Sequence, residues 1–172
     1  IGLRTTATIM FGHVDSPNDW ATHLLHLREL QIRTGGLTEF VPLPFVPMET
    51  PIYLKGCSRR GPTFREAVLM HAIARLSLHP LIPNIQASWV KMGPEGLKAC
   101  LNAGVNDIGG TLMNESITRA AGATYGQEMA PHQMDKLICS VGRTPRQRTT
   151  LYSDPPLQQT TSSFAASPLK IE

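Results

Sequence analysis

The sequence has 172 residues, of which 41% are hydrophobic and 17% are charged. That length is typical of a single domain, and the composition excludes an intrinsically disordered chain. No apolar run approaches the roughly 20 residues that cross a bilayer, so we expect no membrane-spanning segment. The net charge of +3 is small and its excess lies late in the chain, so we expect no nucleic-acid binding.

Three cysteines, Cys57, Cys100 and Cys139, are too widely spaced for a disulfide framework or a metal-binding motif. Free thiols fit a reducing compartment, and we expect a cytoplasmic protein, with an organelle as the alternative if the source is eukaryotic. The chain opens with Ile1 rather than Met and enters an apolar run almost at once. We therefore expect it to be a fragment of a longer protein.

The first elements form a strand–helix unit. Residues 5–12 are apolar and β-branched and end in glycine, which favours a buried strand. Ser16 as N-cap, with Pro17 at the first helical position, predicts a helix that Gly35 ends.

A second strand is expected over residues 39–45, although Pro42 and Pro44 remove two donors from its ladder. Residues 46–62 show no periodicity and are a candidate lid or binding loop. Thr63 and Glu66 form a capping box ahead of a helix that ends near residue 79. The predicted apolar stripe of that helix includes Phe64, Val68, Ala72 and Leu76.

The second half repeats the alternation and then changes composition. We expect strands over 83–89 and 105–111, and helices over 94–104, 116–121 and 131–141. A basic strap, residues 142–152, follows the last helix. Residues 153–172 are rich in Asp, Pro, Gln, Thr and Ser, so we expect a disordered tail after an ordered domain of residues 1–152.

Four strands alternating with helices indicate an α/β fold of parallel units, either a barrel or a doubly wound sheet. A complete barrel takes about 250 residues. We therefore expect about four βα units, the carboxyl-terminal half of a TIM-type barrel.

Ligand sites in such folds lie beyond the carboxyl ends of the strands. The residues at these predicted ends are His13, Asp15, Lys91, Asn114 and Glu115. The third strand also places Asn84, Gln86 and Ser88 on one face, which predicts a polar cavity.

Each polar residue also has a structural interpretation. His13 could be satisfied by a backbone carbonyl, Lys91 could be solvated, and Glu115 could cap a helix. For the strap arginines, pairing with carboxylates is favoured over binding a phosphate.

Six stretches carry a family resemblance: TTATIMFGHVD, TGGLTEFVPLPF, GPTFREAVLMHAIARL, PNIQASWVKMGPEG, NDIGGTLMNESITRAAGA and GRTPRQRTTLY. They resemble the carboxyl-terminal half of radical SAM enzymes of the FO synthase group, specifically the 4-hydroxybenzyl-transferring component. The resemblance implies a [4Fe–4S] cluster, S-adenosyl-L-methionine and a 5′-deoxyadenosyl radical that acts on L-tyrosine. It implies transfer of the 4-hydroxybenzyl group to 5-amino-6-(D-ribitylamino)uracil, toward the deazaflavin of coenzyme F420.

The resemblance also implies where ligands bind. The family's CxxxCxxC motif lies in the amino-terminal half, so this chain holds no metal site and is expected to be inactive alone. A GxIxGxxE-like pattern assigns Thr8, Met10, Gly12 and Asp15 to the cofactor side. Substrate-binding residues are then His13, Asn84, Gln86, Ser88, Lys91, Asn114 and Glu115. The expected partners are the amino-terminal half of the same barrel and the companion FO synthase component.

Two alternatives remain open. Radical SAM enzymes of the futalosine pathway of menaquinone biosynthesis share the GHV segment and an FxPxxF-type strand. The NDIGGTLMNES and TPRQRTTLY runs favour the FO synthase group over them. The other alternative is a non-catalytic module of a split barrel.

Overall fold

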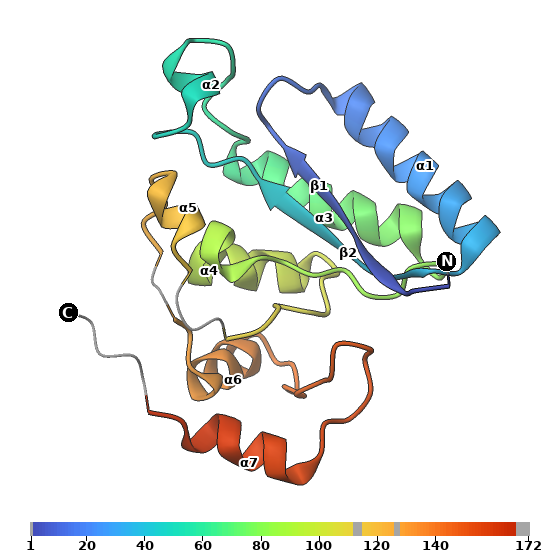
Figure 1. Cartoon of the computed structure of the whole chain (residues 1–172), viewed down its shortest axis with the longest axis vertical. Helices are drawn as coiled ribbons and strands as arrows, with labels where there is room; N and C mark the ends of the chain where they lie inside the picture. Colours follow the sequence, from blue (N-terminus) through green and yellow to red (C-terminus); the bar gives the residue numbers. More distant parts are fainter. Residues whose placement is uncertain (1, 112–114, 126–127, 168–172) are drawn as a thin grey trace.

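A computed structural model describes residues 2–111, 115–125 and 128–167. The fold is α/β, with a two-stranded parallel sheet and helices packed around it (Figure 1). In chain order the elements are β1 Thr5–Phe11, α1 Pro17–Thr34, β2 Leu37–Pro44, α2 Pro51–Leu54, α3 Phe64–Leu78, α4 Trp89–Asn102, α5 Ile117–Ala120, α6 Pro131–Ser140 and α7 Leu157–Ala165. Within the described ranges, no helix is long and apolar enough to cross a membrane.

The two prolines of β2 explain the extent of the sheet. β2 pairs with β1 along its whole length, with Phe40 opposite Ala7 and Pro44 opposite Phe11. On its other side, Phe40 donates to the Asn84 carbonyl and accepts from the Gln86 N–H. Because backbone groups alternate sides along a strand, Pro42 and Pro44 lack their N–H on this second side. The ladder toward residues 84–87 therefore ends after one bridge.

The third and fourth strands that we predicted do not form; the two segments make only isolated bridges. Phe40 bridges Ile85 and Gln86 bridges Asp107, both in parallel, so the four segments lie in the predicted order. Neither 83–89 nor 105–111 forms an extended strand, and Trp89 already begins α4. Gly93, at φ 64°, kinks α4 just before Pro94, the residue from which we expected the helix to start.

The helix caps match the prediction, whereas the buried face of α3 matches it only in part, with Val68 packed against the core. Capping boxes form at Ser16 with Asp19 and at Thr63 with Glu66. Phe64 and Leu76, two residues of the predicted stripe, are 59% and 81% exposed. The buried side consists of Ala67, Met70, His71, Ala74 and Leu78. Apolar residues occur on both sides of this helix, so packing decides which side is buried.

Two segments that we expected to be irregular contain helices. The loop 46–62 includes α2, and the tail that we expected to be disordered forms α7. The ring of Phe164 on α7 meets His132 of α6 edge-on, with centroids 4.9 Å apart. This contact anchors α7 on α6, so part of the tail belongs to the folded structure.

The core lies between the sheet and the helices on one of its faces. Figure 1 shows α1 and α3 running alongside β1 and β2, with α6 and α7 beyond α4. Phe11, Phe40 and Ile85 point into this core and are fully buried. The alternate residues of β1, Thr6, Thr8 and Met10, are exposed on the opposite face. That second face of the sheet carries the polar residues considered next.

Candidate functional site

The turn after β1 is organised around the Asp15 carboxylate. It accepts hydrogen bonds from the N–H groups of Gly12 at 2.9 and 3.0 Å, from His13 at 2.8 Å, and from the Trp20 indole. Burial alone would raise the pKa of Asp15, but these hydrogen bonds lower it below its usual value. Gly12 has φ 91°, and a Cβ there would lie 2.3 Å from the Pro62 ring. Both residues therefore shape the turn itself.

Thr8 and Met10 lie on the open face of β1, as the predicted cofactor side requires. His13 is partnered locally. Its Nδ1 lies 2.7 Å from both the Val14 nitrogen and the Asp15 carboxylate, and its ring packs edge-on against Phe45. Contact of these residues with a ligand stays a prediction.

The polar face predicted over residues 84–88 is present. Ile85, Ala87 and Trp89 are buried, whereas Asn84, Gln86 and Ser88 are half-buried on the other side. Asn84 donates its amide to the Thr38 carbonyl at 2.9 Å, and Gln86 donates to Glu39 at 3.0 Å. Ser88 precedes α4 without capping it through its side chain.

The remaining predicted residues lie near α4 and α5. Glu115 accepts from the N–H and hydroxyl of Thr118, so it caps the start of α5. Burial lowers the pKa of Lys91, and the charge of Glu115 partly opposes that shift. Asn114 lies outside the described residues. The structure thus gives Glu115 a helix-capping role and places its charge close enough to Lys91 to affect the pKa of that lysine.

Sequence reasoning named Gln86 and the strap arginines but did not join them into one polar group. We call this group the Glu39 cluster: Thr6, Glu39, Gln86, Asp107, Arg148 and Tyr152. Glu39 is only 8% exposed, and Arg148 and Tyr152 reach it from the strap. Arg148 also binds the buried carboxylate of Asp107. A glutamate within an apolar strand and arginines in a distant strap were the available signals. The predicted pairing of strap arginines with carboxylates is confirmed at Arg148.

The electrostatics of the cluster follow from burial and pairing. Burial would lower the pKa of Arg148, but the hydrogen bond and charge of Asp107 raise it. Burial and the hydrogen bond to Glu39 both raise the pKa of Tyr152, which therefore stays protonated and donates. The Arg148 guanidinium lies 4.1 Å from the centre of the Tyr152 ring, within cation–π range.

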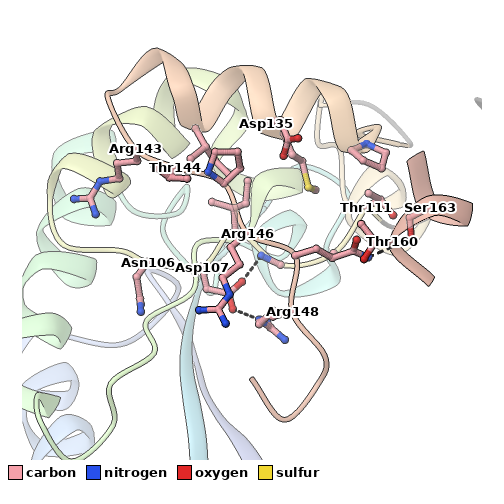
Figure 2. A pocket seen from close by; sticks show the side chains of 18 of the residues that line it. Asn106, Asp107, Thr111, Asp135, Arg143, Thr144, Arg146, Arg148, Thr160 and Ser163 are labelled. Atoms are coloured by element: carbon pink, nitrogen blue, oxygen red, sulfur yellow. Dashed lines mark hydrogen bonds and ion pairs between the residues drawn. The ribbon is translucent and has the colours of Figure 1, made fainter. Parts of the chain in front are cut away.

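A cavity of about 1090 Å³ adjoins the cluster (Figure 2). It lies between residues 106–111, α6, the strap and α7, and its labelled lining includes Asp107, Asp135 and Arg146. Of the predicted site residues that the structure describes, only Asn84 lines it. The cavity and the open polar face of β1 and residues 84–88 are therefore neighbouring features, which meet at Asn84, Asp107 and Arg148.

No group of three metal-ligating side chains occurs in the ranges that the structure describes. The three cysteines are free, and burial raises the pKa of Cys100 to about 12, which disfavours its thiolate. The residues present thus do not fit an iron–sulfur cluster.

Fold and site together define an α/β unit with an open polar face, and comparison with known proteins places it more closely. Residues 34–161 match the family described as "CofH/MqnC C-terminal region", and the chain belongs to this family. It is 54% identical over 152 residues to a Methanopyrus kandleri 5-amino-6-(D-ribitylamino)uracil–L-tyrosine 4-hydroxyphenyl transferase, covering 88% of this chain and 41% of that protein. It is 52% identical over 153 residues to a Mycobacterium leprae FO synthase, covering 89% of this chain. The chain spans only 18% of that relative.

Proposed function

We propose that this chain is the carboxyl-terminal part of a radical SAM transferase of FO biosynthesis. It would contribute to moving the 4-hydroxybenzyl group of L-tyrosine to 5-amino-6-(D-ribitylamino)uracil. The observation that supports this most strongly is identity above 50% to relatives with those names along nearly nine-tenths of the chain. Because these named relatives are FO synthases and the transferase, the menaquinone alternative is not favoured.

The architecture supports a half-barrel role. Four parallel segments lie side by side, with helices on the Phe40 side and polar residues on the Gln86 side. In a β/α barrel the inner face and both outer edges of such a half would meet the other half. We propose that the amino-terminal half of the same barrel covers these edges and carries the [4Fe–4S] cluster.

When bound there, the cluster and S-adenosyl-L-methionine supply the 5′-deoxyadenosyl radical. Residues of this chain would bind and orient the organic ligands. Thr8 and Met10, on the open face beside the Asp15 turn, would adjoin the cofactor. Asn84, Gln86, Ser88 and Lys91 would adjoin the substrates. We also propose that the protein acts in the cytoplasm and works with a companion FO synthase component.

A chimera tests it. This chain replaces the matching 41% of the M. kandleri transferase. The purified chimera is reconstituted anaerobically and given L-tyrosine, the aminouracil and S-adenosyl-L-methionine. We expect the hydroxybenzylated uracil by mass spectrometry, with the unaltered M. kandleri enzyme as positive control. A folded chimera that cleaves S-adenosyl-L-methionine yet forms no such product would contradict the proposal.

A further inference from the structure

Glu39 is the centre of the cluster because donors from three other segments converge on its carboxylate. Thr6 of β1 donates its hydroxyl to Oε1 at 2.7 Å. Oε2 accepts from Gln86 Nε2 at 3.0 Å, from Arg148 at 3.3 Å and from the Tyr152 hydroxyl. Each of these donors occupies part of the carboxylate's accepting capacity, and burial keeps competing water away.

This arrangement fixes which way the Gln86 carboxamide points. A carboxylate can only accept hydrogen bonds, so Gln86 must present its NH₂ group to Glu39 and its carbonyl oxygen elsewhere. That oxygen lies beside Gly109, where an added Cβ would be 3.1 Å away. It accepts no hydrogen bond from any residue that the structure describes, and it is not among the buried unpaired atoms. Among the described residues, an oriented acceptor is thus left without a donor beside Gly109.

The strap supplies two of the donors in a preformed geometry. Tyr152 adopts φ 65° in a turn closed by Thr149 N–H to the Ser153 carbonyl at 2.8 Å. Tyr152 N–H donates to the Thr149 carbonyl at 3.0 Å. Arg148 forms an ion pair with the Asp107 carboxylate and stacks on the Tyr152 ring. Both side chains are therefore directed at Glu39 by contacts of their own.

We propose that Glu39 is a positioning residue, which, held by Arg148 and Tyr152, orients the Gln86 carbonyl to accept a ring N–H of the aminouracil substrate. The proposal rests on the proposed function and names the substrate group, a ring N–H, that this site would recognise. An amide carbonyl complements the N–H of a pyrimidinedione. The ammonium of tyrosine would be met better by a carboxylate, and the Glu39 carboxylate already accepts four hydrogen bonds.

The test uses the chimera and two variants, Glu39→Met and Glu39→Gln. Methionine removes the accepting oxygens, so the Gln86 carboxamide is no longer held in one orientation. Glutamine can keep a carbonyl oxygen at the Oε2 position, to which Gln86, Arg148 and Tyr152 all donate, and turn its NH₂ group toward the Thr6 hydroxyl. Losing one buried hydrogen bond typically weakens binding roughly 5- to 150-fold. We expect the KM for the aminouracil to rise within that range in Glu39→Met and to rise much less in Glu39→Gln, with the KM for tyrosine unchanged in both. Glu95→Gln, on an exposed residue paired with Lys98, is the matched control and should change neither.

A double variant separates positioning from simple packing. Gln86→Met removes the accepting carbonyl itself, so we expect it to raise the aminouracil KM as Glu39→Met does. If Glu39 acts through Gln86, Glu39→Met/Gln86→Met should raise the aminouracil KM no further than Gln86→Met alone. Tyr152→Phe, which removes one donor without changing the charge, should give a smaller rise and serves if Glu39→Met fails to fold.

A direct binding measurement tests the inference independently of the proposed function. Equilibrium dialysis of the aminouracil against the chimera and its variants needs no turnover. Binding that weakens in Glu39→Met, is largely kept in Glu39→Gln and weakens no further in the double variant than in Gln86→Met supports the inference even if no product forms. Equal rises in both KM values, effects of Glu39→Met and Gln86→Met that simply add, or no aminouracil binding at all would overturn it.

Discussion

At the residue scale, Asp15 has a structural role in its own turn that the sequence did not predict. The pattern that holds Gly12 and Asp15 predicted cofactor contact, which stays a prediction. The fold shows that both carboxylate oxygens turn back onto the Gly12 and His13 N–H groups and the Trp20 indole. The sequence marked these two residues, but it could not give the direction of their hydrogen bonds.

Asp15→Asn should therefore destabilise the chain. An amide has one accepting oxygen where the carboxylate has two, so we expect a loss of about 1–3 kcal/mol in the free energy of unfolding. Because the folded-state pKa is lowered, the carboxylate's contribution is present above its unfolded pKa and is lost as pH falls through the folded value. Urea unfolding followed by tryptophan fluorescence at pH 7 measures the effect.

The control for this change is Asp154→Asn, because the Asp154 side chain is 71% exposed in its pair with Arg146. A surface pair of this kind contributes little. Equal unfolding midpoints for Asp15→Asn and the unsubstituted chain would show that the turn does not depend on the carboxylate.

At the element scale, α3 illustrates what a helical pattern predicts and what it leaves open. Its capping box placed the start correctly, and its end lies within one residue of the expected position. Its predicted apolar stripe was right only in part: Val68 packs against the core, whereas Phe64 and Leu76 lie exposed on the outer side. Local hydrogen bonding fixes helix ends, whereas the buried side depends on which neighbours the helix meets.

His71 on the buried side of α3 gives a test at this scale. Its Nδ1 bonds the Ala67 carbonyl at 2.7 Å, and its buried Nε2 has no hydrogen-bond partner among the residues that the structure describes. Burial lowers the pKa of His71, so the unfolded chain binds the extra proton and stability falls as pH drops below about 6.5. His71→Leu removes the unpaired nitrogen and should flatten this dependence without loss of stability at pH 7.5.

The measurement is the urea midpoint at pH 7.5 and pH 5.5 for both proteins. His79→Leu is the control, because His79 is exposed at the end of α3. A midpoint for His71→Leu that falls with pH as steeply as that of the unsubstituted chain would assign the acid sensitivity to other groups.

At the scale of the whole molecule, the parallel order of four segments was predictable, and the length of two of them was not. Alternation of apolar runs with helices gave the order. The side on which Pro42 and Pro44 lack donors was not visible until the neighbours of β2 were known. The Glu39 cluster was equally hidden, because it depends on which strap residues reach which strand.

The outer surface of α1 and α3 carries apolar residues that remain exposed: Leu25 at 63%, Ile73 at 42% and Leu76 at 81%. Exposed apolar groups of this size favour self-association. Leu25→Lys/Leu76→Lys should therefore keep the 172-residue chain monomeric to higher concentration, as measured by sedimentation velocity. Leu78→Lys, at a fully buried position of the same helix, should instead unfold it. Identical sedimentation of the double variant and the unsubstituted chain would locate self-association elsewhere.

Glu39 receives hydrogen bonds from residues 109 and 113 positions further along the chain. During synthesis β1, β2 and residues 84–87 leave the ribosome well before Arg148 does. A carboxylate buried without its cation is costly, so the polar face around Glu39 is complete only once the strap is in place. We therefore expect a product cut short before Arg148 to keep β1 and β2 but to leave Glu39 without its cation and Gln86 without a fixed orientation.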